Sequence, residues 1–249
     1  MNQDPTQGDN RTGIATNKRQ ADQMLEGTLE FPPSSTGSLH PDERVRIDYA
    51  LDVADRRGLG SVPSPANLKG AAKAVLEKLK GNRPTLLLDK LGERLAFERT
   101  GTRLYEAMVS KHEADGGYLG GPTREELVGI LNDEHRHFAM LVDVVRDLGG
   151  DPTALTPSAD AIAVVSMGVI QIVVDPRTTL LQGLEAMLVA ELADRDGWMV
   201  LVDLAREADK DELVACFEQA ERTEAEHLAK VRGWIRAAQG LGGSSFAAE

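Results

Sequence analysis

The sequence predicts an all-α protein. Aromatic residues make up only 4% of the 249 residues, whereas hydrophobic residues make up 41%, and a core of aliphatic side chains favours packed helices over a β-sandwich or barrel. In addition, four long segments place apolar residues at steps of three and four, which is the period of a helix with one buried face. We therefore expect a bundle of helices.

The charge and cysteine content argue against several classes of protein. The chain carries 28 basic and 40 acidic side chains, a formal net charge of −12, whereas nucleic-acid binding depends on clustered Lys and Arg. We expect no nucleic-acid partner. The single cysteine, Cys216, excludes an intramolecular disulfide and a four-thiolate zinc site. The N-terminus is polar and lacks the apolar segment of a secretory signal, so we expect a cytoplasmic protein.

The chain divides into four parts. Residues 1–40 are polar and aperiodic, and we expect a flexible arm. Residues 41–83 carry two short helical patterns, the second opened by Asn67, and we expect a helical extension at the N-terminus. Residues 84–240 carry the long helical patterns of a bundle. Residues 241–249 are rich in Gly and Ser, and we expect a flexible tail.

The four long helices are expected in two consecutive pairs. Glycines after residue 115 and after residue 148 mark helix ends. Thr123, followed three residues later by Glu126, predicts a capping box at the start of the second helix. The expected helices cover Leu86–Glu113, Thr123–Leu148, Thr179–Glu207 and Asp211–Gln239.

A connection of about thirty residues, from Asp151 to Thr178, separates the second helix from the third. This length is too great for a bundle turn, and a crossover with its own helix joins parallel neighbours. The apolar run Ala161–Val174 falls short of the roughly 18 residues of a membrane span. We expect this run to be a buried helix and expect no membrane contact.

Each of the four apolar stripes contains a glutamate where an aliphatic residue would fit the period. Two of these stripes also contain a histidine three residues later, which lies on the same helical face. Burying an isolated carboxylate costs several kcal/mol or more, so a buried cluster of them requires cations. The residues concerned are Glu98, Glu134, His137, Glu191, Glu224 and His227.

The arrangement is repeated in the two halves of the chain. Glu98 precedes Glu134 by 36 residues and Glu191 precedes Glu224 by 33, so each pair returns to a similar height in its hairpin. Here the sequence resembles the ferritin-like di-iron carboxylate superfamily, in which two helices each supply a Glu and two supply Glu-x-x-His. The resemblance covers about residues 84–240 and implies a ferritin-like four-helix bundle with a long crossover.

The resemblance also implies roles for these six residues. Glu98 with His137 would bind one metal ion and Glu191 with His227 the other, while Glu134 and Glu224 would bridge both. Two iron ions are the first expectation and two manganese ions the alternative, because carboxylate and imidazole ligands suit either metal.

Three further residues are candidates for supporting roles. Tyr105 lies seven residues after Glu98 and is a candidate for hydrogen bonding to a ligand or for electron transfer. Asp133 and Asp194 are candidates to orient a histidine.

Three functions follow as competing hypotheses. The first is a di-iron oxidoreductase that reacts with oxygen or hydrogen peroxide, of the ferroxidase or peroxidase type. The second is a dimanganese, catalase-like enzyme. The third is a helix-bundle interaction or metal-storage protein without catalysis. In each case we expect a homo-oligomer formed through helix faces, such as a dimer.

Overall fold

The computed structural model describes residues 60–63 and 84–241 of the chain. Five helices, labelled α4 to α8, account for most of the described residues. This confirms the all-α prediction. The predicted arm at 1–40, most of the extension at 41–83 and the tail after Leu241 lie outside the described residues.

The chain forms two compact units. The described part of the first unit comprises residues 60–63, 84–92 and 145–160, and that of the second comprises residues 93–144 and 161–241. In the first unit the amide of Ser61 donates a hydrogen bond to the carbonyl of Leu155 at 3.1 Å. The bundle described below belongs to the second unit.

The first hairpin consists of α4 (Pro84–Asp115) and α5 (Arg124–Asp147). The predicted capping box is present, because the Glu126 amide donates to Thr123 Oγ1 at 3.2 Å and the Thr123 amide donates to Glu126 Oε2 at 2.8 Å. Gly116, in the left-handed region with a φ of 79°, follows the end of α4 and turns the chain.

The second hairpin consists of α7 (Leu180–Glu207) and α8 (Asp211–Ala238). Thr179 caps α7, since its hydroxyl accepts a hydrogen bond from the Gln182 amide while the Gln182 side chain accepts one from the Thr179 amide. All four predicted helix ranges agree with the structure to within two residues at each end.

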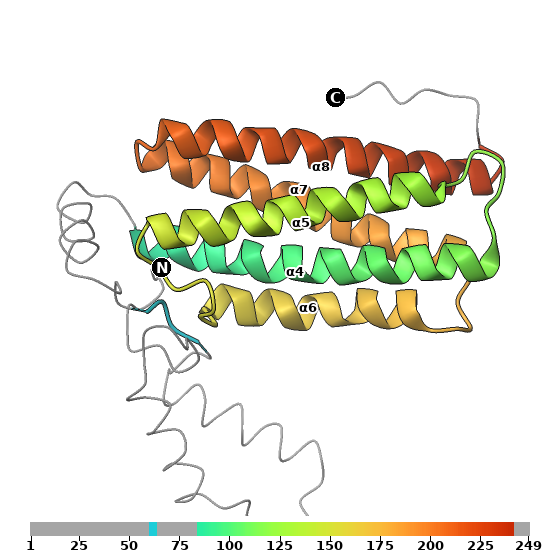
Figure 1. Ribbon diagram of the computed structural model, residues 1–249, viewed down its shortest axis with the longest axis horizontal. Helices are drawn as coiled ribbons and strands as arrows, with labels where there is room; N and C mark the ends of the chain where they lie inside the picture. Colours follow the sequence, from blue (N-terminus) through green and yellow to red (C-terminus); the bar gives the residue numbers. More distant parts are fainter. Residues whose placement is uncertain (1–59, 64–83, 242–249) are drawn as a thin grey trace, which may run out of the picture. The chain divides into compact units, whose positions relative to one another are not determined.

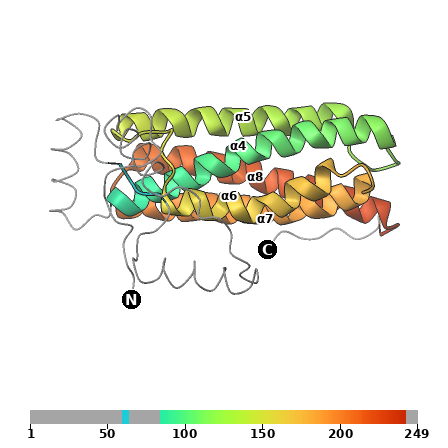
Figure 2. The same cartoon turned by 90° about the horizontal axis from the view of Figure 1, so that it is seen from below.

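The crossover carries α6 (Pro157–Val174), as the sequence predicts. In the second unit, α4 and α8 run in one direction and α5 and α7 in the other, with α6 alongside them (Figure 1, Figure 2). The crossover therefore joins two parallel helices, α5 and α7. This is the wiring expected from its length.

The core of the second unit is aliphatic around a few large rings. It extends over the inward faces of all four bundle helices and one face of α6. Its largest fully buried side chains include Trp198, Tyr105, Phe217, Leu104 and Met108. The expectation that α6 is a buried helix is wrong, because only 17% of this segment is buried. Among the described helices, it is the one that is long and apolar enough, by length and composition alone, to cross a membrane.

Loss of the Thr179 cap is expected to destabilise the protein. Thr179→Ala removes one partner of the capping box and should lower the free energy of unfolding by about 1 kcal/mol, measured by urea denaturation followed by circular dichroism. Ser110→Ala is the control, because this exposed hydroxyl only donates to the carbonyl of Glu106 within α4. An equal loss in both variants would contradict the role of the cap.

Candidate metal centre

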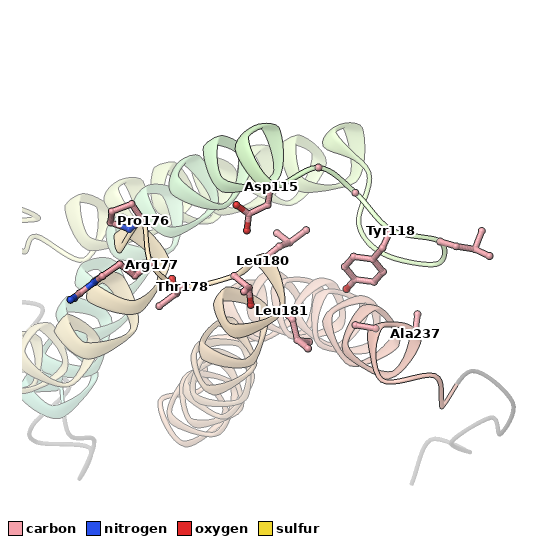
Figure 3. Close-up of a pocket in the computed structure, with 13 residues that line it drawn as sticks. Asp115, Tyr118, Pro176, Arg177, Thr178, Leu180, Leu181 and Ala237 are labelled. Carbon is pink, nitrogen blue, oxygen red and sulfur yellow. The ribbon is translucent and has the colours of Figure 1, made fainter.

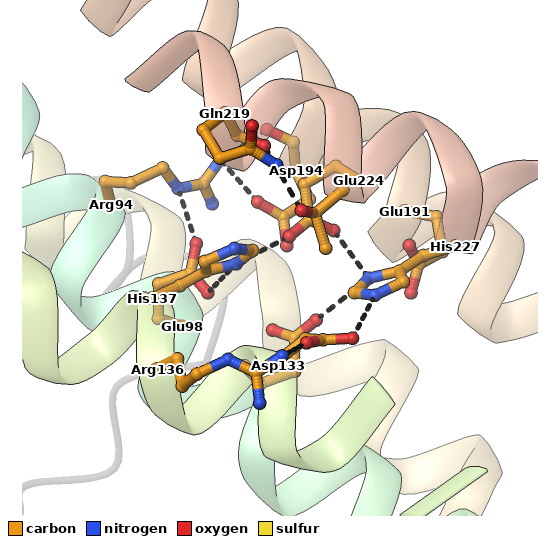
Figure 4. Close-up of polar contacts among 12 residues, drawn as sticks. Arg94, Glu98, Asp133, Arg136, His137, Glu191, Asp194, Gln219, Glu224 and His227 are labelled. Carbon is orange, nitrogen blue, oxygen red and sulfur yellow. Dashed lines mark hydrogen bonds and ion pairs between the residues drawn. The ribbon is translucent and has the colours of Figure 1, made fainter. Parts of the chain in front are cut away.

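The six residues singled out from the sequence lie together in the middle of the bundle. Their side chains come from four helices and none is more than 7% exposed. Each glutamate lies on the apolar face of its helix. This face points into the bundle, so the helical period places the carboxylate in the core. The six are Glu98 on α4, Glu134 and His137 on α5, Glu191 on α7, and Glu224 and His227 on α8 (Figure 4).

Glu224 lies between the two histidines. Its Oε1 is 2.7 Å from His137 Nδ1 and its Oε2 is 3.0 Å from His227 Nδ1. One carboxylate thus faces both halves of the cluster, as a bridging ligand must.

Glu98 and Glu134 lie on either side of Glu224. Glu98 Oε2 is 3.8 Å from His137 Nδ1, and Glu134 Oε1 is 3.6 Å from His227 Nδ1. Glu98, His137 and Glu224 offer ligand atoms within 4.8 Å of one another, and so do Glu134, Glu224 and His227. The cluster therefore offers two sets of ligands that share Glu224.

Glu191 is held by Tyr105. The Tyr105 hydroxyl donates a short hydrogen bond to Glu191 Oε1, and both residues are buried. The hydrogen bond leaves Glu191 Oε2 without a hydrogen-bond partner. Tyr105 is therefore placed to orient this carboxylate.

The outer nitrogen of His227 is also fixed. Its Nε2 lies 3.2 Å from Asp133 Oδ2, and Asp133 is paired in turn with Arg136. An imidazole whose outer nitrogen bonds a carboxylate presents its other nitrogen in a defined direction. His137 instead meets the edge of the Trp198 ring, with centroids 5.3 Å apart.

Arg94 is a buried cation of the cluster that the sequence analysis did not identify. Its Nη1 lies 3.2 Å from Asp194 Oδ1 and its Nε lies 3.6 Å from Glu98 Oε1. Nη1 also donates to the carbonyl of Asp194 at 2.8 Å. The available sequence signal was its position four residues before Glu98 on the same helical face. Asp194, predicted to orient a histidine, pairs with this arginine.

Gly197 makes room for Arg94. A Cβ atom built at Gly197 would lie 1.9 Å from Arg94 Nη1. Any larger residue on this turn of α7 therefore displaces the guanidinium. The pair explains how a long cationic side chain reaches the middle of the bundle.

The charges of the cluster identify what it can hold. Five carboxylates are buried there, those of Glu98, Glu134, Glu191, Asp194 and Glu224. With all five carboxylates ionised and both histidines neutral, as metal binding requires, Arg94 would offset one of the five negative charges. The four that remain would balance the charge of two divalent cations.

The oxygen atoms support the same conclusion. Both carboxylate oxygens of Glu98 and of Glu134 are buried without a hydrogen-bond partner. Buried polar atoms normally have a partner, and atoms left without one require an explanation. Metal coordination supplies it, and the residues fit a pair of metal ions.

The cluster changes the proton affinity of its members. Burial, together with Asp194, raises the pKa of Glu98 well above its usual range, and burial with Glu224 and Glu134 does the same for Glu191. Burial also acts against the charge of Glu224 and of His227. Nevertheless, His137 and His227 lower the pKa of Glu224 to about 2, while Glu134 and Glu224 raise the pKa of His227 to about 10.

The hollow in Figure 3 lies away from this cluster. It has a volume of about 670 Å³ and includes Asp115, Tyr118, Arg177, Leu180 and Ala237 among its lining residues. None of the cluster residues lines it. It lies where the turn after α4 approaches the start of α7 and the end of α8.

Two antiparallel hairpins joined by a long crossover thus hold a Glu on α4 and α7 and a Glu-x-x-His on α5 and α8. This helix order and wiring are those expected from the sequence. A solved ferritin-like, diiron-carboxylate protein from Bacillus anthracis str. Ames is 20% identical to this chain. The alignment has a TM-score of 0.45 and covers 60% of this chain and 94% of the other. Family models and curated proteins give no match.

Gly197→Ala should destabilise the protein by displacing Arg94. We expect a loss of about 1 to 3 kcal/mol, typical of overpacking in a core, measured by urea denaturation of the metal-free protein. Gly129→Ala and Gly233→Ala are matched controls, because a Cβ at either position meets no atom within 4 Å. Both lie within helices, so the controls should hold or gain stability. Equal stability of Gly197→Ala and the controls would contradict the packing role of Gly197.

The metal-free protein should lose stability as the pH rises. The folded chain holds protons on Glu98 and Glu191 that the unfolded chain releases above a pKa of about 4.5. It holds one on His227 between the unfolded pKa of 6.5 and the folded pKa of about 10. Because the folded state binds more protons than the unfolded state, a rise in pH lowers the free energy of unfolding.

Calorimetric melting between pH 4.5 and pH 10 would measure the effect. The melting temperature of the metal-free protein should fall, and that of metal-loaded protein should change less, because metal ions replace these protons. A metal-free protein that gains stability between pH 6.5 and 10 would contradict the assignment.

Proposed function

We propose that this ferritin-like protein binds two iron ions and uses them in redox chemistry with oxygen or hydrogen peroxide. The observation that carries the proposal is the buried cluster of four glutamates and two histidines. All of these residues except Glu191 belong to groups whose ligand atoms lie within 4.8 Å of one another. Its donors are carboxylate oxygens and imidazole nitrogens, a set that suits iron or manganese. The thiol of Cys216 is not among them.

The residues of the chain define two metal positions. Glu98 and His137 would hold the first ion, Glu191 and His227 the second, and Glu134 and Glu224 would span both. Glu224 supports this assignment best, because its two oxygens already face the two histidines. When bound, a pair of iron ions supplies the electrons that reduce oxygen or peroxide.

The protein itself contributes orientation, an oxidisable side chain and exclusion of water. Asp133 fixes the imidazole of His227 through its outer nitrogen at 3.2 Å. Tyr105 holds Glu191 by a hydrogen bond and brings an oxidisable phenol next to the cluster. Trp198, Phe217 and the aliphatic core around the cluster keep bulk water away.

A dimanganese, catalase-like enzyme is the second candidate. The same donor set favours it, because manganese shares the preference for carboxylate and imidazole ligands. Metal content and oxygen release from peroxide distinguish it from the iron protein. A storage or interaction protein would bind metal and show no turnover with either oxidant.

Metal analysis of the expressed protein should find about two ions per chain. The double variant Glu134→Ala, His227→Ala removes a carboxylate and an imidazole from the cluster and should abolish binding. The double variant Glu185→Ala, His135→Ala is the matched control, because these two side chains are exposed.

Turnover completes the test. Protein loaded with Fe(II) should consume oxygen or peroxide as the iron is oxidised to Fe(III), and the cluster variant should not. Bound iron that never changes its oxidation state with either oxidant would rule out the redox function. Two ions retained in the cluster variant would rule out the site itself.

A further inference from the structure

Asp194 is a buried carboxylate of the cluster that the six-ligand arrangement leaves without a role toward the metal. It is 3% exposed and lies three residues after Glu191 on α7. The same spacing separates the glutamate from the histidine on α5 and on α8, and residues three apart share one helical face. Asp194 therefore occupies on α7 the position that a histidine ligand occupies on the other two helices.

The direction of the helices decides which half of the cluster Asp194 belongs to. α5 and α7 run in the same direction and α8 runs in the opposite one (Figure 1). A residue three places after the glutamate of α7 is therefore on the side of His137 and away from His227. Trp198, one turn beyond Asp194, agrees with this placement, because its ring meets His137 with centroids 5.3 Å apart.

The carboxylate of Asp194 is within reach of a shared cation. It offers an oxygen atom that lies within 4.8 Å of one oxygen atom each from Glu98, Glu134 and Glu224. Glu98 and Glu224 also form the ligand group of His137. Asp194 Oδ1 and both oxygens of Glu98 are buried without a hydrogen-bond partner. Buried oxygens of this kind require an explanation, and a cation among these carboxylates supplies it.

Arg94 supplies the charge that a further carboxylate requires. Its Nη1 donates to the main-chain carbonyl of Asp194 at 2.8 Å, and the same nitrogen lies 3.2 Å from Asp194 Oδ1 (Figure 4). A carboxylate has two oxygens with about four acceptor positions, so it can face a guanidinium and a metal ion at the same time. Together the two residues add an oxygen donor to the cluster and no net charge.

We propose that Asp194 is a seventh ligand of the metal centre and binds the ion that Glu98 and His137 hold. This inference rests on the metal binding of the proposed function and not on its redox chemistry. Asp194 gives this ion one oxygen donor more than the ion of Glu191 and His227. Oxygen donors suit hard divalent cations such as Mn(II). The fuller ligand set leaves fewer open positions for an oxidant on this ion than on the other.

The competing role for Asp194 is that of a counter-ion to Arg94 alone. In that case apolar residues of similar volume could replace both members of the pair without loss of metal, because such replacements of buried ion pairs are often neutral. The double variant Arg94→Met, Asp194→Leu makes this replacement. It keeps the net charge of the cluster and removes the oxygen donor, so it separates the two roles.

Titration of the full chain with Mn(II), followed by the electron paramagnetic resonance signal of the free ion, measures the effect. The wild-type protein should bind two ions, and the double variant should bind one of them at least about tenfold more weakly. Arg195→Met, Glu221→Leu is the matched control, because this ion pair at 2.8 Å also joins an arginine to a carboxylate but lies outside the cluster. The control should bind both ions as the wild type does, and circular dichroism should show equal helix content in all three proteins.

A crystal structure of the Mn(II)-loaded wild-type protein tests the ligand directly. An oxygen of Asp194 should lie within about 2.0 to 2.6 Å of an ion, the range of metal–oxygen ligand distances. Two bound ions with Asp194 in contact with Arg94 alone would overturn this inference and leave the proposed function intact. Unchanged affinity of the Arg94→Met, Asp194→Leu variant for both ions would overturn it as well. A wild-type protein that binds no Mn(II) and no iron would refute the metal centre as a whole.

Discussion

The structure depends on the burial of five carboxylates and one arginine in the middle of an aliphatic bundle. Desolvation of these groups is expensive, and their mutual repulsion adds to the cost. The raised pKa values of Glu98, Glu191 and Asp194 express this cost directly. Arg94 offsets part of this cost within the chain, and the proposed metal ions would offset the rest. The proposed metal centre would therefore be part of the electrostatic balance of the fold.

The two halves of the cluster have different surroundings. Near His227, Asp133 fixes the imidazole and Tyr105 holds Glu191. Near His137, the guanidinium of Arg94 lies close to Glu98 and Asp194, in the space left by Gly197. A permanent positive charge beside one half offsets part of the carboxylate charge there. The symmetry of the sequence motifs is thus broken by a single arginine.

The crossover serves two purposes in this bundle. It returns the chain so that the second hairpin can present its ligands in the same order as the first (Figure 1). It also adds α6, whose packed face contributes Val173 to the core while its other face stays apolar and exposed.

The sequence by itself determined the helices, their ends and the six candidate ligands of the cluster. Helical periodicity places Glu98 or His227 on an inward face from local spacing alone, and a capping box such as Thr123 with Glu126 is a local signal. Only the tertiary structure decided which charges meet. Arg94 and Asp194 are 100 residues apart, and nothing local shows that Gly197 leaves room between them. The exposure of α6 was also decided by packing, because a helix that is apolar on all sides has no period that marks its buried face.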